Sequence, residues 1–295
     1  MEKPAVYFTK NISPERVLEL YNTLGRKLTG NTAIKIHSGE SGNQNFLKPE
    51  FWKPIIETIG GTAVECNTAY GGARNTTDKH RQLMNDHGWD KYFNVEIMDA
   101  DGPDIVLDIN GGKVIKKNYV GKYMSKYNSM LVLSHFKGHP MGGYGGALKQ
   151  LSIGCASSAG KANIHSAGKT DDQNIVWDNH AEQNKFLEAM ADAAKSIIEY
   201  FNGNIIYINV MKNLSVDCDC CSVAENPCMQ DIGMLISLDP VAIDQACIDL
   251  VYAATDDAGQ KHFIERVESR NGIHTIEAAA EIGCGVREYE LINID

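Results

Sequence analysis

Four cysteines lie close together in one stretch of the chain: Cys218, Cys220, Cys221 and Cys228. Thiolates bind soft cations such as zinc or iron, and they also hold iron–sulfur clusters. The stretch lacks the repeated two-residue gaps of ferredoxin runs. It therefore predicts either a thiolate-bound metal or cluster, or a set of reduced thiols packed beside the protein core.

Histidine and lysine side chains form a second candidate group. His135, Lys137 and His139 directly follow the apolar run 130–133, and His165 closes the glycine-rich stretch that comes next. Neutral imidazole ligates metals and transfers protons near neutral pH. We take these four residues as candidate catalytic residues; surface or capping histidines are the alternative.

Glycines and lysines follow this group: Gly142, Gly143, Gly145, Gly146, Lys149 and Lys161. Successive glycines let backbone amides approach a phosphate or carboxylate, and a helix starting near Gly146 would direct its positive end at the same anion. Ala162 stands where a P-loop carries Ser or Thr for magnesium, which disfavours ATP hydrolysis. The stretch predicts either a simple anion site or flexible turns.

Two further polar loops carry weaker candidates for substrate binding. His37 ends one predicted strand, and Arg74 lies in the loop after the next. Because parallel strands present their carboxyl ends at one sheet edge, a single crevice would collect these loops. Cys66 and Cys155, at a strand end and in the glycine-rich stretch, are additional candidates.

The pattern of elements that would position these residues predicts an α/β fold: a mixed, mostly parallel sheet with helices on both faces. Short β-type runs alternate with amphipathic helical segments. Ser13 before Pro14 and Asp239 before Pro240 are typical helix starts. The predicted strands are 5–8, 32–37, 62–66, 95–99, 129–134, 204–210, 232–237 and 288–292, and the main later helices are 181–201, 240–252, 260–269 and 275–282.

Two regions are expected to depart from this alternation. Asn110 and Gly111 predict a hairpin between strands 104–109 and 113–115, attached to the sheet. Residues 135–169 contain eight glycines and no sustained periodicity, which indicates a long functional loop with one short helix at the carboxyl ends of the strands.

The domain organisation is predicted as residues 1–170, an α/β domain with the His- and Gly-rich loop, and residues 171–295, an α/β half with the cysteine-dense loop. No repeat, low-complexity tract or linker marks the boundary. A single domain is therefore the alternative.

Composition limits the classes of partner. The chain of 295 residues has a formal net charge of −10, which argues against nucleic acid and anionic membrane surfaces as partners. No secretory signal or apolar span is apparent, so we expect a cytoplasmic protein whose eight cysteines are reduced.

Nearly the whole chain resembles a family of uncharacterised iron–sulfur-centre proteins with a domain of unknown function. The resemblance rests on 64–70, 135–165, 218–244 and 287–291. Longer members carry a two-cluster ferredoxin module between the positions equivalent to His165 and Ala181, where this chain has only about 15 residues without cysteine. The resemblance implies a short form whose remaining cluster or metal ligands are the cysteines of 218–228.

These observations favour a metal or iron–sulfur protein, of redox-enzyme type, acting on a small anionic molecule. The cofactor would be an iron–sulfur cluster or a thiolate-bound zinc or iron. One alternative is a non-redox isomerase, racemase or metal-dependent acid–base enzyme; the glycine-rich stretch also resembles lactate racemase, which carries a nickel cofactor. Another is an electron carrier or metal-binding module for a redox partner protein.

Overall fold

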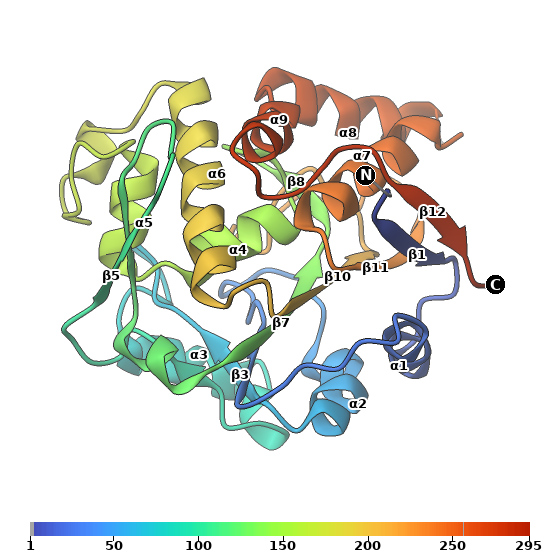
Figure 1. The fold of residues 1–295 in the computed structure, drawn as a ribbon, viewed down its shortest axis with the longest axis horizontal. Helices are drawn as coiled ribbons and strands as arrows, with labels where there is room; N and C mark the ends of the chain where they lie inside the picture. Colours follow the sequence, from blue (N-terminus) through green and yellow to red (C-terminus); the bar gives the residue numbers. More distant parts are fainter. Residues whose placement is uncertain (1–2, 256) are drawn as a thin grey trace.

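The computed structural model describes residues 3–255 and 257–295. Their central feature is an eight-stranded sheet with the order β12-β1-β11-β10-β7-β2-β3-β4, flanked by helices on both faces (Figure 1). This arrangement confirms the predicted α/β class with a mixed, mostly parallel sheet.

The sheet strands agree closely with the predicted ones. Their bounds are β1 Ala5–Thr9, β2 Thr32–Lys35, β3 Thr62–Glu65, β4 Glu96–Ile97, β7 Ser129–His135, β10 Ile205–Met211, β11 Gly233–Ser237 and β12 Glu290–Asn293. All neighbours pair in parallel except β11, which is antiparallel to both β1 and β10. Strands β7 and β10 are buried along their whole length, as expected for strands covered on both faces.

The helices cover the two faces. Their bounds are α1 Pro14–Thr23, α2 Pro49–Ile59, α3 Thr77–Asp86, α4 Ala147–Cys155, α5 Ser158–His165, α6 Gln183–Tyr200, α7 Pro240–Ala253, α8 Asp257–Ser269 and α9 Ile273–Glu281. The predicted caps are confirmed, because Ser13 accepts a hydrogen bond from the Arg16 amide and Asp239 accepts from Val241 and Ala242.

Alternate residues of β7 face two different cores. Met130 and Val132 pack with α4, α6 and α7, whereas Leu131 and Leu133 pack with α1 and α2. This two-residue period fixes which face of the sheet each helix covers, and it places α4 and α6 together on one face (Figure 1).

The expectation for residues 104–115 is partly wrong. A hairpin forms, with Gly111 at positive φ, but β5 Ile105–Asp108 pairs with β6 Lys117–Val120 as a separate two-stranded sheet. Residues 113–115 are not a strand because their amides all donate to the Asp192 carboxylate, 2.7–2.9 Å away.

The expectation of a long loop over residues 135–169 is also wrong in detail. The region contains the short hairpin of β8 Lys137–His139 and β9 Gly143–Gly145, followed by two helices, α4 and α5. Its low periodicity reflects burial on all sides, since every residue from 142 to 148 is buried.

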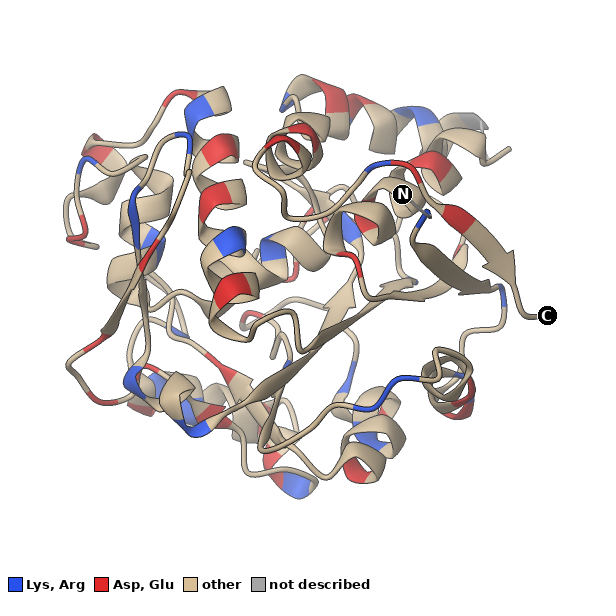
Figure 2. Ribbon diagram, viewed as in Figure 1, with Lys and Arg blue, Asp and Glu red and all other residues tan. Residues whose placement is uncertain are grey.

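Strands from both sides of the predicted boundary near residue 170 form the one large sheet, since β10 lies between β7 and β11. Charged residues concentrate on helices and loops around the largely uncharged strands (Figure 2). Within the described residues, none of the helices has the length and apolar character needed to cross a membrane.

Candidate active and metal site

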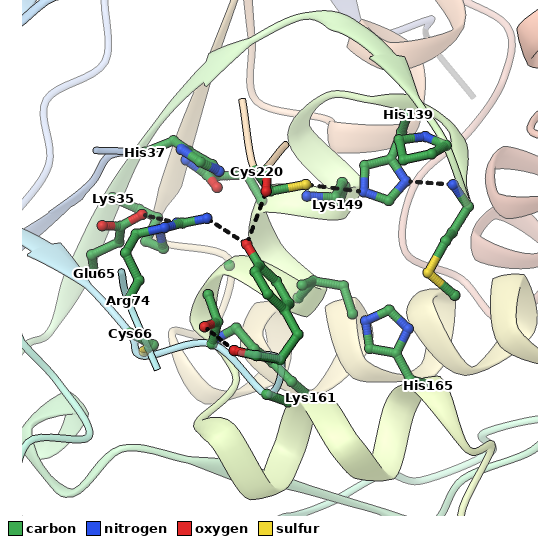
Figure 3. A pocket seen from close by; sticks show the side chains of 18 of the residues that line it. Lys35, His37, Glu65, Cys66, Arg74, His139, Lys149, Lys161, His165 and Cys220 are labelled. Carbon is green, nitrogen blue, oxygen red and sulfur yellow. Dashed lines mark hydrogen bonds and ion pairs between the residues drawn. The ribbon is translucent and has the colours of Figure 1, made fainter. Parts of the chain in front are cut away.

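A cavity of about 250 Å³ lies at the carboxyl ends of β2 and β3. Strands β2 and β3, helices α4 and α5, and the cysteine loop after β10 all contribute to its wall (Figure 3). The prediction that polar loops would meet at this sheet edge therefore agrees with the structure. Four cationic side chains line the cavity, but Glu65 is the one carboxylate among the described lining residues.

Arg74 belongs to a buried ion-pair network in the cavity wall. Its guanidinium lies 3.2 Å from both Glu40 and Glu65, and it donates to the Tyr70 hydroxyl at 2.7 Å. Nε2 of His80 lies 2.7 Å from Glu65 on the other side. Burial opposes ionisation of Glu65, but His80, Lys35 and Arg74 together hold its pKa well below the usual range.

Lys35 and Lys161 place two further ammonium groups in the cavity wall. Their exposed fractions are 1% and 6%, and neither has a carboxylate within ion-pair distance among the described residues. Each donates to one backbone carbonyl, of Ile36 and Ala156 respectively. Burial lowers the pKa of Lys35 and outweighs the nearby Glu65, which raises it.

At the other side of the cavity, three side chains form a group that could hold a metal ion. The ligand atoms of His139, Cys218 and Cys220 all lie within 4.8 Å of one another. Nε2 of His139 is 3.7 Å from the Cys220 sulfur. Tetrahedral zinc with ordinary Zn–S and Zn–N bonds places such atoms about 3.6 Å apart, so the spacing fits one thiophilic ion.

The orientation of His139 is fixed by the turn after β8. Its Nδ1 accepts hydrogen bonds from the amides of Met141 and Gly142, at 3.1 and 2.8 Å. Nε2 is consequently the nitrogen that faces the sulfurs. His37 is held in the same manner, because its Nδ1 accepts from the amide of Gly39. Burial and the nearby Arg74 lower the pKa of His37 to about 4.

Several donors surround the Cys218 sulfur. The amide of Cys220 lies 3.3 Å away, and the Lys149 ammonium lies 3.8 Å away. Burial disfavours the thiolate, yet the Cys220 hydrogen bond, Lys149, Lys137 and His139 together hold the pKa of Cys218 well below its ordinary value. The site thus stabilises an anionic sulfur, which is the form that binds metals and attacks electrophiles.

His135 and Lys137, predicted as catalytic, anchor the cysteine loop. Nδ1 of His135 lies 3.0 Å from both oxygens of Asp219, and the Lys137 ammonium lies 3.1 Å from the same carboxylate. Since Asp219 stands between Cys218 and Cys220, these contacts fix both sulfurs. Neither His135 nor Lys137 is among the described residues that line the cavity.

Cys221 and Cys228 lie outside the three-residue group. The Cys221 side chain hydrogen-bonds with that of Cys220, and the Cys228 sulfur donates to the carbonyl of Leu214 at 3.4 Å. Asn43 links the loop to the first half of the chain by donating to the carbonyls of Cys218 and Cys221. Two of the four predicted thiolate ligands are therefore brought together with a histidine.

His165 projects from the end of α5 into the cavity wall. Its ring stacks on Phe186 at 4.8 Å and contacts Trp177 at 5.3 Å. Its exposed fraction is 8%, and Nδ1 is buried without a hydrogen-bond partner. Burial, with His139, Lys149 and Lys161 nearby, lowers its pKa to about 3, so the ring is neutral.

The predicted glycines serve packing within the protein. An added Cβ on Gly146 would lie 2.4 Å from Asp244, and Gly143 adopts a φ of +80° against the backbone of Gly272. The amides of Ala147 and Leu148 at the start of α4 donate to Asp244. The anion at this helix start is therefore the protein's own carboxylate. Gly142 and Gly145 lie against His139 and Lys149 respectively.

Sequence reasoning missed Lys35, Glu65 and Tyr70. Lys35 and Glu65 end β2 and β3 and lie within the predicted strands 32–37 and 62–66, so a charged residue near the carboxyl end of a buried parallel strand was the signal that could have identified them. Tyr70 donates toward the carbonyl of Cys220, a contact across 150 positions that no local pattern indicates.

Comparison with known proteins identifies one family model. The model of a family described as a domain of unknown function (DUF362) matches residues 32–249, most of the chain. No curated protein matches the sequence.

Two solved structures are similar at low identity. The lactate racemase apoprotein from Thermoanaerobacterium thermosaccharolyticum has 14% identity and a TM-score of 0.39 over 69% of this chain and 50% of that one. A structural-genomics protein from Thermotoga maritima has 10% identity and a TM-score of 0.38 over 91% of this chain and 58% of that one. The chain thus spans about half the length of these neighbours.

Proposed function

Since the chain belongs to the DUF362 family, whose description assigns no activity, we propose from the site itself that it is a metal-dependent enzyme acting on a small organic anion. The metal is a single thiophilic divalent ion, zinc or iron, held by His139, Cys218 and Cys220. The observation that carries the proposal is the convergence of these three ligands at the wall of a cation-lined cavity.

The number of ligands supports catalysis over a structural role. Structural zinc sites use four protein ligands, whereas catalytic sites use three and leave a position for water or substrate. His139 and Cys220 both line the cavity, so an open position can face it. An ion there would supply Lewis-acid polarisation of a substrate oxygen.

The surrounding side chains support an anionic substrate. Lys35, Lys149 and Lys161 reach the cavity from β2, α4 and α5 and attract negative charge. His165 contributes a neutral imidazole that can exchange protons or hydrogen-bond with the bound molecule. This set favours acid–base chemistry over an electron-carrier module, which has no need of a cation-lined cavity.

A redox enzyme with an iron–sulfur cluster at this site is a more specific version of the proposal. A cluster needs about four thiolates. Cys218 and Cys220 belong to the three-residue group, the Cys221 side chain hydrogen-bonds to Cys220 beside that group, and the Cys228 sulfur donates to the Leu214 carbonyl. The geometry accordingly favours one ion, and iron at this position would permit one-electron chemistry that zinc does not.

A second candidate function is a metal-free cysteine nucleophile at Cys218. With Nδ1 of His139 accepting from two amides, the proton of the neutral ring resides on Nε2 and points at the sulfurs. A cation that binds Nε2 needs the ring proton on Nδ1 instead, so metal binding would require the Met141 and Gly142 amides to release Nδ1. Without a metal, the same donors around Cys218 would stabilise a reactive thiolate.

Cobalt titration tests the metal proposal, because cobalt(II) bound to thiolates absorbs strongly through charge transfer. We expect one equivalent to bind to the wild type and the band to be lost in Cys218→Ser and Cys220→Ser. Cys284→Ser is the matched control, since this buried thiol lies near the Ala191 carbonyl. The proposal would be contradicted if the wild type showed no charge-transfer band, or if only the Cys284→Ser control lost the band. The metal-free cysteine nucleophile would then be the remaining candidate function.

A further inference from the structure

We propose that the ligand of the cavity is a small dianion with two separated anionic groups, one held by Lys35 and Lys161 and the other by Lys149. This inference deepens the proposed function, because it names the substrate class of the same site. It rests on two buried ammonium groups that have no carboxylate partner among the described residues.

Lys35 and Lys161 form the first anion position. Their ammonium groups come from β2 and α5 and act electrostatically on the same two thiols, Cys66 and Cys155, which places the cations near each other. Buried lysines are ordinarily paired, since an uncompensated internal charge is costly. Each has one carbonyl partner and can donate two more hydrogen bonds to a ligand.

The protein's own carboxylates do not fill this position. Glu65 lies nearest, but one of its oxygens is taken by Arg74 and the amide of Ser38, and the other by His80. Glu40 is likewise held by Arg74 and backbone amides. Glu65 acts on Lys35 and Asp104 interacts with Lys161 through space, without an ion pair, so both ammonium groups keep donors that can bind a ligand.

Lys149 forms the second position. Figure 3 shows it beside Cys220 and His139, on the far side of the cavity from Lys35 and Glu65. An anionic group there would lie next to the sulfur group, and hence at the proposed metal. His165 lies near both Lys149 and Lys161, since both act on its ring, and Figure 3 shows it on the side of the cavity away from Lys35.

The neutral ring of His165, whose Nδ1 has no hydrogen-bond partner among the described residues, supports this arrangement. A charged imidazolium would add a fifth cation to the cavity lining, whereas the neutral ring can contact the uncharged part of the ligand. Trp177 packs on His165 and closes this side of the cavity. A cavity of about 250 Å³ suits a small dicarboxylate better than a nucleotide.

Isothermal titration calorimetry with defined probes tests the inference. The probes are malonate and succinate as dianions, acetate as a monoanion, succinamide as a neutral analogue, and inorganic phosphate as a compact anion. We expect the better dicarboxylate to bind at least about tenfold more tightly than acetate, a gap of about 1.4 kcal/mol, with no binding of succinamide.

Variants assign the affinity to the named residues. Lys161→Met and Lys149→Met should each reduce dicarboxylate affinity about tenfold, to the level of acetate. Lys53→Met is the matched control, because Lys53 is a partly exposed lysine on α2 that pairs with Glu57 and is not among the residues lining the cavity. Circular dichroism verifies that each variant is folded.

Three results would overturn the inference: equal affinity for acetate and both dicarboxylates, unchanged affinity in Lys161→Met, or tighter binding of phosphate than of either dicarboxylate. Undetectable binding of every anion would do the same. Titrations in chelator and in zinc separate this inference from the proposed function. Dicarboxylate binding that depends on Lys161, in a protein with no affinity for metal, would refute only the metal proposal. Zinc binding without dicarboxylate binding would refute only the dianion inference.

Discussion

Lys35 carries an ammonium group into the interior at the end of β2, where its exposed fraction is 1%. Such a group serves ligand binding at a cost to the stability of the ligand-free fold, since burial favours its neutral form and lowers its pKa. The folded protein thus binds this proton less tightly than the unfolded chain does.

Replacing this cation with an apolar side chain should stabilise the ligand-free protein. We expect Lys35→Met to raise the free energy of unfolding by about 1–4 kcal/mol, because methionine fills similar space without a buried charge. Urea unfolding at neutral pH measures the change, with Lys53→Met as the partly exposed control. A destabilised Lys35→Met variant would show that the ammonium has a structural partner.

Individual residues of the site were predictable where they belonged to a local cluster. Cys218, Cys220 and His139 were identified because thiols and imidazoles recur within a few positions. The convergence of these three side chains could not be predicted, because it depends on contacts of Asp219 with His135 and Lys137, more than 80 residues away in the sequence. The roles of these last two residues as anchors follow only from that contact.

At the scale of elements, Asp244 of α7 determines where α4 begins. Its oxygens accept from the amides of Ala147 and Leu148, from Asn209 at 2.8 Å and from the Tyr144 hydroxyl at 3.2 Å. These contacts join α4 to β9 and β10. They set the direction of the helix that carries Lys149 to the cavity.

Substituting this carboxylate should weaken the fold in a pH-dependent manner. Asp244→Asn loses acceptors for buried donors, so we expect the free energy of unfolding to fall by about 2–4 kcal/mol. Burial raises the pKa of Asp244 to about 6 in the folded protein. Between its ordinary pKa and this value the folded state binds more protons, so the contribution of Asp244 to stability decreases as pH rises.

The wild type should therefore exceed Asp244→Asn in free energy of unfolding by more near pH 4 than near pH 7, because the pKa of Asp244 is raised to about 6 in the folded protein. Denaturant unfolding at both values measures it, with Asp249→Asn, an exposed site on the same helix, as the control. A stability difference between wild type and Asp244→Asn that grows toward pH 7 would contradict a raised pKa of Asp244.

Element types were predictable where periodicity or caps were clear, as for α1, α7 and the sheet strands. The stretch after β7 was predictable only in part: the expected helix near Gly146 is α4, but α5 was missed because it is buried on nearly all sides and shows no polar face. The strand expected at 113–115 failed for another reason: Asp192, distant in sequence, supplies the hydrogen bonds that a neighbouring strand would otherwise give.

At the scale of the molecule, the parallel pairing of β7 with β10 unites the two halves of the site. It places the loop after β7, with His139, beside the loop after β10, with Cys218 and Cys220. Helices α4 and α5 then bring Lys149 and Lys161 to the same edge (Figure 3). The α/β class was predictable from the alternation of elements, but this strand order was not.

The central claim is a single metal ion at His139, Cys218 and Cys220. Its most direct test is the content of metal and acid-labile sulfide in protein purified without oxygen, compared with Cys218→Ser and Cys228→Ser. We predict about one zinc or iron per chain without sulfide, lost in Cys218→Ser and retained in Cys228→Ser, whose thiol contacts the Leu214 carbonyl. Iron with sulfide that disappears in both variants, or no metal in the wild type even after zinc is added, would contradict the account.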